Sequence, residues 1–174
     1  MTLGTALHAA FLEPGEMLGR FSVYDGTRRG AKWEAFEADN AGRTILTLAQ
    51  SATLTGMIEA LRSHSAVRPL VSSPVGTEVS AIGEVSGLLM KGRADLLSRD
   101  GTLVDIKTTR AGDDRTLSNA IHDYGYAVQA YVYRRLFNAG RFVFVFVESA
   151  PPHDVRCVEL SENWQDIGRQ EALS

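Results

Sequence analysis

Apolar residues recur at helical spacing in the first third of the chain. The first such stripe consists of Leu3, Leu7, Ala10 and Phe11. Pro14 follows it and predicts the end of this helix. A second helix is predicted from about residue 47 to 64, and the segment 68–76, with two prolines and a glycine, breaks its pattern. Residues 21–43 are mixed and punctuated by glycines, so we expect a loop with about one helical turn there.

An alternation of apolar and polar residues begins at residue 77 and predicts β-strands. Residues 77–85 form the first strand, and one of its faces carries Glu78, Ser80, Ile82 and Glu84. Residues 87–97 and 102–109 form two more strands on either side of the sequence "SRDGT". The turn signal between two apolar runs predicts a β-hairpin.

The hairpin turn determines which residues face each other. A three-residue loop with Gly101 in the left-handed conformation is a favoured connection, and it makes Ser98 face Thr102. In this register Asp95 lies opposite Asp105. Directly opposed residues have Cβ atoms only about 5 Å apart. The two carboxylates are therefore predicted to be neighbours.

The last third of the chain predicts a helix, two strands and a final helix. Residues 116–140 are expected to form one long helix closed by Gly140. Residues 141–149 are apolar on both faces, as in a strand covered on both sides, and residues 155–160 form another strand. Residues 162–173 form the final helix. The order of elements predicts an α/β fold with a mixed central β-sheet flanked by helices.

The composition is that of one ordinary domain, predicted to span residues 1–174. The chain is 44% hydrophobic and 22% charged, and its net charge of -3 argues against nucleic-acid binding by a general positive field. The single cysteine, Cys157, excludes an internal disulfide and a four-cysteine metal cage. No apolar run reaches the roughly 18 to 20 residues of a membrane span, and a cationic secretory signal is missing, so a cytoplasmic location is expected.

Asp95, Asp105 and Lys107 are the residues that suggest chemistry. Period two places Lys107 on the same face as Asp105, and two opposed aspartates cannot both stay ionised without a cation. Mg²⁺ fits this arrangement, because it takes one or two carboxylates and keeps waters for a phosphate substrate. The alternative is a solvated hairpin or a structural ion pair. Burial is favoured over solvation by the flanking Leu103, Val104 and Ile106.

A strand aspartate followed about ten residues later by D-x-K resembles the PD-(D/E)xK nuclease superfamily. Together with "GTALHAAFLEP" near the start and "QAYVY" in the predicted helix, it resembles the RecE-like exonucleases, the exodeoxyribonuclease VIII group. The motifs occur in order over nearly the whole chain, although Ala94 stands where the superfamily name has proline. The resemblance implies a restriction-endonuclease-like core.

The resemblance also implies a metal site. Asp95 and Asp105 would ligate Mg²⁺, with Mn²⁺ able to substitute, and the backbone carbonyl of Ile106 would complete the protein ligands. His8 would be an added ligand, as in members related to RecB-type nucleases. Taken alone, a helical histidine is more often a partly buried polar residue.

Two further catalytic positions follow from the same resemblance. Lys107 would orient the attacking water. Glu78 matches the acidic residue that precedes the hairpin, and Glu84, on the same face, is the alternative.

The DNA contacts implied by the resemblance lie in two segments. Gln129 and Tyr133 match a Q-x-x-x-Y helix motif that contacts DNA near the scissile phosphate, and their alternative role is the polar flank of an amphipathic helix. Arg28, Arg29 and Lys32 resemble a basic loop used on the DNA backbone, and they would also be ordinary in a solvated loop.

The implied activity is a Mg²⁺-dependent deoxyribonuclease, most of all a 5′ to 3′ double-strand exonuclease of phage-type recombination. Its expected partners are double-stranded DNA ends, a single-strand annealing protein and, if the chain is complete, further copies in a ring. The alternatives are a structure-specific endonuclease of the same superfamily and a non-catalytic DNA-binding or assembly subunit. The iron–sulfur members of the superfamily are excluded, because they need four cysteines.

Overall fold

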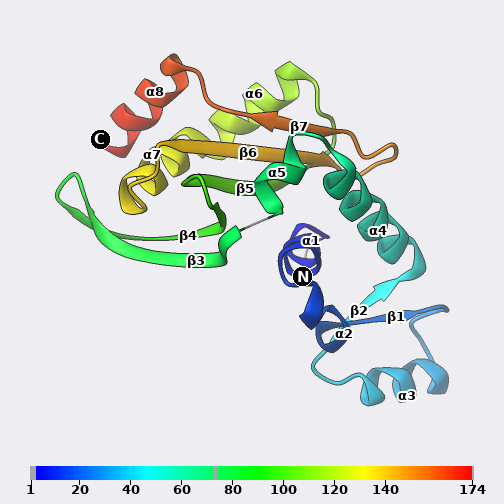
Figure 1. The fold of residues 1–174 in the computed structure, drawn as a ribbon. Helices are drawn as coiled ribbons and strands as arrows, with labels where there is room; N and C mark the ends of the chain where they lie inside the picture. The colour runs from blue at the N-terminus through cyan, green and yellow to red at the C-terminus, as the bar shows by residue number, and fades with distance from the viewer. Residues whose placement is uncertain (1–2, 73, 174) are drawn as a thin grey trace.

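The computed structural model describes residues 3–72 and 74–173, apart from the side chains of 16–18, and its core is a five-stranded mixed sheet (Figure 1). The strands of this sheet, in spatial order, are β3 (Pro74–Val85), β4 (Leu88–Ser98), β5 (Thr102–Thr109), β6 (Arg141–Glu148) and β7 (Val155–Val158). Neighbouring strands are antiparallel except β5 and β6, which are parallel. The helices are α1 (Leu3–Leu12), α2 (Met17–Arg20), α3 (Ala31–Asp39), α4 (Leu48–Ser63), α5 (Val67–Val71), α6 (Asp114–Asp123), α7 (Tyr126–Leu136) and α8 (Glu162–Ala172).

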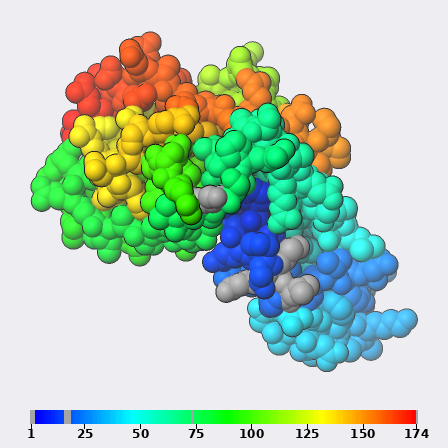
Figure 2. Space-filling view, in the orientation of Figure 1, coloured from blue at the N-terminus to red at the C-terminus, as the bar shows by residue number. Residues whose placement is uncertain are grey.

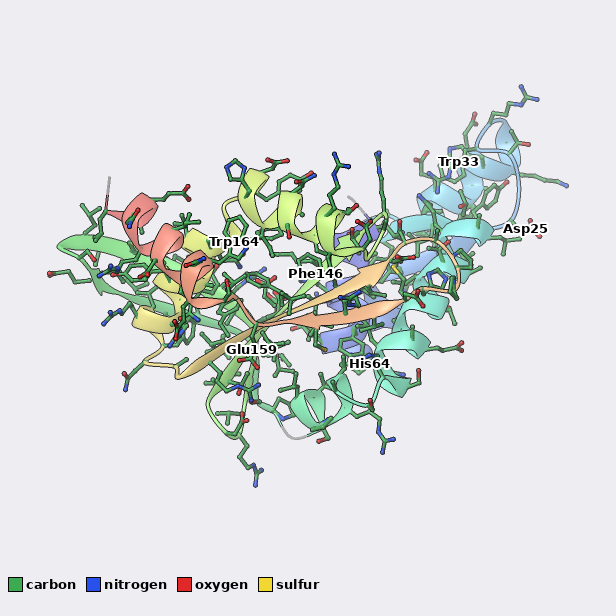
Figure 3. The ribbon with its side chains drawn as sticks, turned by 90° about the horizontal axis from the view of Figure 1, so that it is seen from above. Asp25, Trp33, His64, Phe146, Glu159 and Trp164 are labelled. Carbon is green, nitrogen blue, oxygen red and sulfur yellow. The ribbon has the colours of Figure 1, made fainter. Side chains whose placement is uncertain are left out.

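Helices cover both faces of the sheet, as predicted for an α/β fold. One hydrophobic core joins α1, α4 and α5 to one face and contains Leu7, Leu54 and Val145. The other joins α6 and α7 to the opposite face, where Phe146 lies beneath the helices (Figure 3). The strand β6 contributes to both cores because its residues alternate between the two faces. The fold is therefore restriction-endonuclease-like.

Local signals located several elements correctly. The helix expected around the first apolar stripe is α1, and a 3₁₀ turn at Pro14–Glu16 follows it. Helix α4 begins after Thr47, whose hydroxyl accepts a hydrogen bond from the backbone of Gln50, while the Gln50 side chain accepts one from the backbone of Thr47. This reciprocal capping box satisfies two backbone donors at the start of the helix.

The predicted loop at residues 21–43 is wrong. The segment forms a strand, β1 (Phe21–Tyr24), and the nine-residue helix α3, and β1 pairs in parallel with a second strand, β2 (Thr44–Thr47). Helix α3 buries none of its residues and so has no apolar stripe to reveal it. Its aromatic rings pack on Tyr24 instead, with Trp33 at 5.1 Å and Phe36 at 4.9 Å between ring centroids. Strand β1 and helix α3 form a lobe, the β1–α3 lobe, that projects from the rest of the molecule in Figures 2 and 3.

The predicted helix 116–140 is also divided. It breaks into α6 and α7 at Gly125, which is left-handed with a φ of 63°. Helix α7 ends before Asn138, not at Gly140, because Asn138 is itself left-handed, with a φ of 49°. The backbone of Ala139 then donates to the carbonyl of Arg134 at 2.9 Å, which is the six-to-one hydrogen bond of a Schellman cap.

In the described part of the chain, every helix is too short or too polar to cross a membrane.

Candidate active site

Acidic residues of three neighbouring strands meet where the sheet opens. The pairs Thr77–Leu96 and Val79–Ala94 flank Glu78 and place it across from Asp95 in the register of β3 and β4. On the other side, the observed pairs of β4 and β5 have the predicted hairpin register, with Gly101 at a φ of 80°. Glu78 thus lies on the strand next to Asp95, and Asp105 lies on the strand on its other side.

The backbone ladder is interrupted at this row. Glu78 has a φ of 52°, which is rare for a residue with a side chain and marks a kink in β3. Pairing between β4 and β5 ends at Leu96, and the carboxylate of Asp95 accepts the N–H of Ile106 at 2.7 Å. A side chain thus takes the place of a strand partner, so Asp95 does not oppose Asp105 through a continued ladder.

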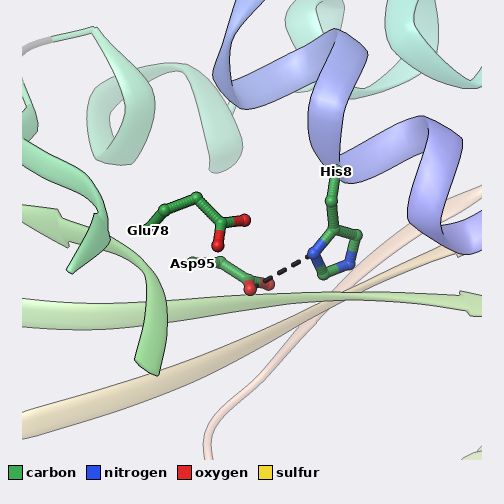
Figure 4. Close-up of side chains that lie close together, drawn as sticks. All are labelled: His8, Glu78 and Asp95. Carbon is green, nitrogen blue, oxygen red and sulfur yellow. Dashed lines mark ion pairs between the residues drawn. The ribbon is translucent and has the colours of Figure 1, made fainter. Parts of the chain in front are cut away.

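His8, Glu78 and Asp95 form a compact cluster between α1 and the sheet (Figure 4). One ligand atom from each of the three lies within 4.8 Å of those of the other two. His8 Nδ1 lies 3.2 Å from Asp95 Oδ1, and Nε2 is hydrogen-bonded to the carbonyl of Ile106 at 2.6 Å. The resemblance implied His8 and Ile106 as metal ligands, and they are in direct contact here.

The surroundings of His8 favour its protonated form. Burial alone lowers the pKa of His8, but the hydrogen bond and charge of Asp95, together with the Ile106 carbonyl, more than offset it, so the pKa is raised above 6.5. Both ring nitrogens face acceptors, which suits an imidazolium. A cation bound at the cluster would replace this proton.

Asp105 is held separately, on the side of the sheet that α7 covers. It is 3% exposed, its Oδ1 accepts a hydrogen bond from Gln129, and Lys107 Nζ lies 2.6 Å from Oδ2. Burial first, and then the charge of Asp95, raise the pKa of Asp105 against the opposing effects of Lys107 and Gln129. The Lys107 ammonium is also 4.8 Å from the centre of the Tyr126 ring.

The donor set fits a divalent cation that prefers oxygen ligands. Lys107 Nζ lies 2.6 Å from the buried Oδ2 of Asp105, and within the described residues this oxygen makes no hydrogen bond. Burial and the neighbouring charge of Asp95 both disfavour the ionised Asp105, and a cation near the two carboxylates would relieve both effects. Two carboxylates and an imidazole within 4.8 Å supply further ligands.

A cleft of about 490 Å³ gives access to this cluster. It runs between α1 on one side and β3, β4 and β5 on the other, and its lining includes His8, Glu78, Ile106 and Lys107. Sequence reasoning missed Arg93, which also lines it and whose guanidinium lies 2.7 Å from Glu78. The alternation of β4 could have found Arg93, because it lies two residues before Asp95.

Glu78, not Glu84, is the acidic residue beside the cluster. Glu84 pairs with Leu89 near the far end of the β3–β4 hairpin, six positions along the strand. Glu78 shares the cleft with His8.

The residues implied as DNA contacts have varied surroundings. The Tyr133 hydroxyl accepts the N–H of Arg93 at 3.2 Å, and Gln129 binds Asp105, so both support the site from α7. The basic triplet Arg28, Arg29 and Lys32 lies in the β1–α3 lobe and does not line the cleft. Contact of these five residues with DNA remains a prediction.

The mixed five-stranded sheet covered by helices, with acidic residues where the strands diverge, is the architecture of the PD-(D/E)xK superfamily. A family described as "PDDEXK-like domain of unknown function (DUF3799)" matches residues 1–173, and the chain belongs to this family. The match supports the superfamily predicted from the sequence and does not single out the RecE-like group.

Comparison with solved structures agrees on the fold. A crystal structure of a Eubacterium rectale protein, provisionally described as an exonuclease, has a TM-score of 0.67 at 13% identity, covering 99% of this chain and 64% of that chain. This chain thus spans less than two thirds of that protein, and the likeness concerns the fold alone. A structure of SSO0001, at 22% identity over 96% of this chain and 83% of that chain, has a TM-score of 0.40 and carries no argument. No curated protein matches the chain in sequence.

Proposed function

We propose that this protein is a divalent-metal-dependent deoxyribonuclease that hydrolyses phosphodiester bonds. More specifically, we propose a double-strand exonuclease that acts 5′ to 3′ from DNA ends. The observation that carries the proposal is the cluster of His8, Glu78 and Asp95 beside the Asp105–Lys107 pair, with His8, Glu78 and Lys107 lining one cleft. These ligands come from α1, β3, β4 and β5, and their convergence on a cleft is typical of a site for chemistry.

The metal would be held by His8, Glu78 and Asp95, with Asp105 and the Ile106 carbonyl adjacent. When bound, Mg²⁺ or Mn²⁺ makes water a better nucleophile and stabilises charge on the phosphate. The chain itself contributes Lys107, whose side chain is 21% exposed and reaches the cleft. Its ammonium orients the attacking water and balances the negative charge that develops on the phosphate.

Gln129 and Tyr126 keep this arrangement in place. The Gln129 amide donates to Asp105 at 2.5 Å and thereby fixes the carboxylate. The ring of Tyr126 lies under the Lys107 ammonium and stacks on Phe144, with 5.3 Å between the ring centroids. Both supports come from α7, so the helix holds the catalytic pair from behind.

The test is digestion of linear and closed-circular duplex DNA with Mg²⁺. An exonuclease consumes only the linear form, a structure-independent endonuclease cuts both, and a binding module spares both. Labels at either 5′ or 3′ ends then give the polarity. Asp95→Asn is the control, because it removes a charge at the cluster and should abolish activity. Loss of circular DNA would overturn the exonuclease assignment, and failure to digest either form would leave the non-catalytic subunit or an endonuclease that requires a branched structure.

The expected ring of subunits and the single-strand annealing partner stay predictions. Light scattering of the purified chain measures the first.

A further inference from the structure

A second groove continues the cleft on the side of α6. It has a volume of about 750 Å³, within the range of ligand sites, and it shares Gly4, Thr108 and Tyr126 with the catalytic cleft. Lys107 lines the catalytic cleft and Thr108 lines both cavities, so a chain bound at the catalytic lysine can enter this groove without leaving the surface.

An exposed aromatic ring stands at this groove. Tyr124 is 72% exposed although it belongs to a tight connection between α6 and α7. Its N–H donates to Ala120, and the following Gly125 donates to His122, each at 3.1 Å. These hydrogen bonds close the turn that carries the exposed ring.

Tyr124 is also the outer end of a row of rings that leads to the catalytic lysine. Its centroid lies 5.6 Å from that of Tyr126, with 33° between the planes, and Tyr126 in turn lies against the Lys107 ammonium and stacks on Phe144. One face of an aromatic platform is therefore free beside the site, and it is anchored in the core.

The rest of the groove distributes charge unevenly. On the side of β5 lie Thr108, Thr109 and Arg110, and Arg110 is exposed and has no ion-pair partner within residues 3–72 and 74–173. On the side of α6, Asn119 and Asp123 lie near Tyr124. A phosphate is attracted to the first side and repelled by the carboxylate of the second, whereas a base edge can hydrogen-bond to an amide or carboxylate.

We propose that this groove binds a nucleotide of single-stranded DNA next to the scissile phosphate, with its base stacked on Tyr124 and its phosphate at Arg110. The inference rests on the proposed function for its choice of polymer. An unpaired strand is required, because in a duplex the face of each base is covered by its neighbours, whereas a single strand offers it to an aromatic side chain. The enzyme would thus act on a strand whose end is already unpaired or becomes unpaired as it enters.

Binding is tested on the full chain with a fluorescein-labelled oligothymidylate and a blunt duplex of equal length, by anisotropy, in EDTA and again with Ca²⁺. Tyr124→Ala should weaken single-strand binding about five- to 150-fold, the equivalent of one lost base–aromatic stack. Tyr124→Phe keeps the ring and should bind within about twofold of the parent. Duplex binding should change much less than single-strand binding in both variants, because only the terminal base pairs of a blunt duplex offer a free base face.

Arg110→Ala should weaken single-strand binding and lower the slope of log affinity against log salt by about 0.7, the value for one phosphate on a single strand. Arg115→Ala is the matched control, because Arg115 is an exposed arginine of α6 that does not line the groove. It should leave both affinity and slope unchanged. Melting curves of all four variants check that each is folded.

Four results would overturn the inference: a parent that does not bind the single strand in either condition, a folded Tyr124→Ala that binds like the parent, a Tyr124→Phe as weak as Tyr124→Ala, or a Tyr124→Ala that loses duplex binding as much as single-strand binding. The last result would place paired DNA on the ring. None of these readings needs catalysis. If single-strand binding depends on Tyr124 but the protein has no nuclease activity, only the proposed function is refuted. If the protein is an active nuclease whose single-strand binding does not depend on Tyr124, only the groove proposal is refuted.

Discussion

The folding stability of the metal-free protein should depend on the charge of the buried Asp105 carboxylate. Its pKa is raised above 3.8, which means that the folded state disfavours the ionised form. Folding stability supplied by this group is therefore greatest at low pH and falls as pH rises through the folded pKa. In the folded protein burial and the charge of Asp95 disfavour the ionised carboxylate of Asp105, and Lys107 and Gln129 only partly offset that cost.

Asp105→Asn should relieve this cost at nearly constant volume. The asparagine carbonyl can still accept from Gln129, and the side chain of Lys107 is 21% exposed and can turn to water. Breaking a fully buried ion pair costs about 3–5 kcal/mol because a charge is left inside, but here the remaining ammonium is not trapped. We expect the variant to be inactive and, in EDTA at pH 8, to melt at or above the parent temperature.

Metal should reverse that order. A ligand at about 100 times its Kd stabilises the folded state by ~2.7 kcal/mol, and ~1 kcal/mol corresponds to about 2–4 °C in a protein of this size. The parent should therefore gain about 5–11 °C from saturating Mg²⁺ or Mn²⁺, and Asp105→Asn much less.

The assay is a set of melting curves at pH 8, with and without the divalent metal, for the parent, Asp105→Asn and Asp39→Asn. Asp39 is exposed at the end of α3, so this control removes the same charge away from the cleft. Its metal shift should equal that of the parent. An Asp105→Asn protein that melts well below the parent in EDTA, or gains as much from metal, would show that Asp105 is a structural ion-pair partner.

Three further predictions concern the site and its support. Lys107→Ala should lower the nuclease rate by roughly two to four decades and leave the Mn²⁺ melting shift intact; near-normal turnover would remove the lysine from the mechanism. His8→Ala should weaken Mn²⁺ binding in calorimetry. The parent's affinity for Mn²⁺ should rise with pH, because the pKa of His8 is raised and the imidazole must lose its proton before it can bind the metal; an affinity independent of pH would contradict the ligand role. In EDTA the folding stability supplied by His8 is complete below pH 6.5 and is lost as pH rises through the folded pKa. Gly168→Ala should destabilise the protein by about 1–3 kcal/mol in denaturant melts, because a Cβ there would lie 2.2 Å from the carbonyl oxygen of Ala127, whereas Gly140→Ala, with no atom within 4 Å, is the control.

Several features of the site region could be predicted from local sequence alone. The loop ending in Gly101 determined the hairpin register, because only a few turns join adjacent antiparallel strands and one of them needs a left-handed third residue. Period two then placed Asp105 and Lys107 on one face, where they form an ion pair. These conclusions depend on neighbours within about a dozen residues.

The bounds of other helices depend on tertiary packing, which no local sequence pattern predicts. Helix α3 was missed because its aromatic residues contact Tyr24 of β1, a tertiary contact, and no apolar stripe marks it. The long helix of the prediction is divided at Gly125, where a left-handed residue redirects the chain so that α6 and α7 both cover the sheet. Propensity alone does not distinguish a tolerated glycine from a break.

The arrangement of the metal ligands is the part that only the tertiary structure decided. The sequence contains His8, Glu78 and Asp95, but it cannot give the packing of α1 on the sheet that brings a histidine to a carboxylate 87 positions further on, at 3.2 Å. Nor does it show that Asp95 takes the N–H of Ile106 and so ends the ladder, which opens the sheet for the cluster. The period of a strand determines the face on which each acid lies. The distance between acids of different strands depends on where hydrogen-bonded pairing stops, and this is settled by the helices that pack on either side.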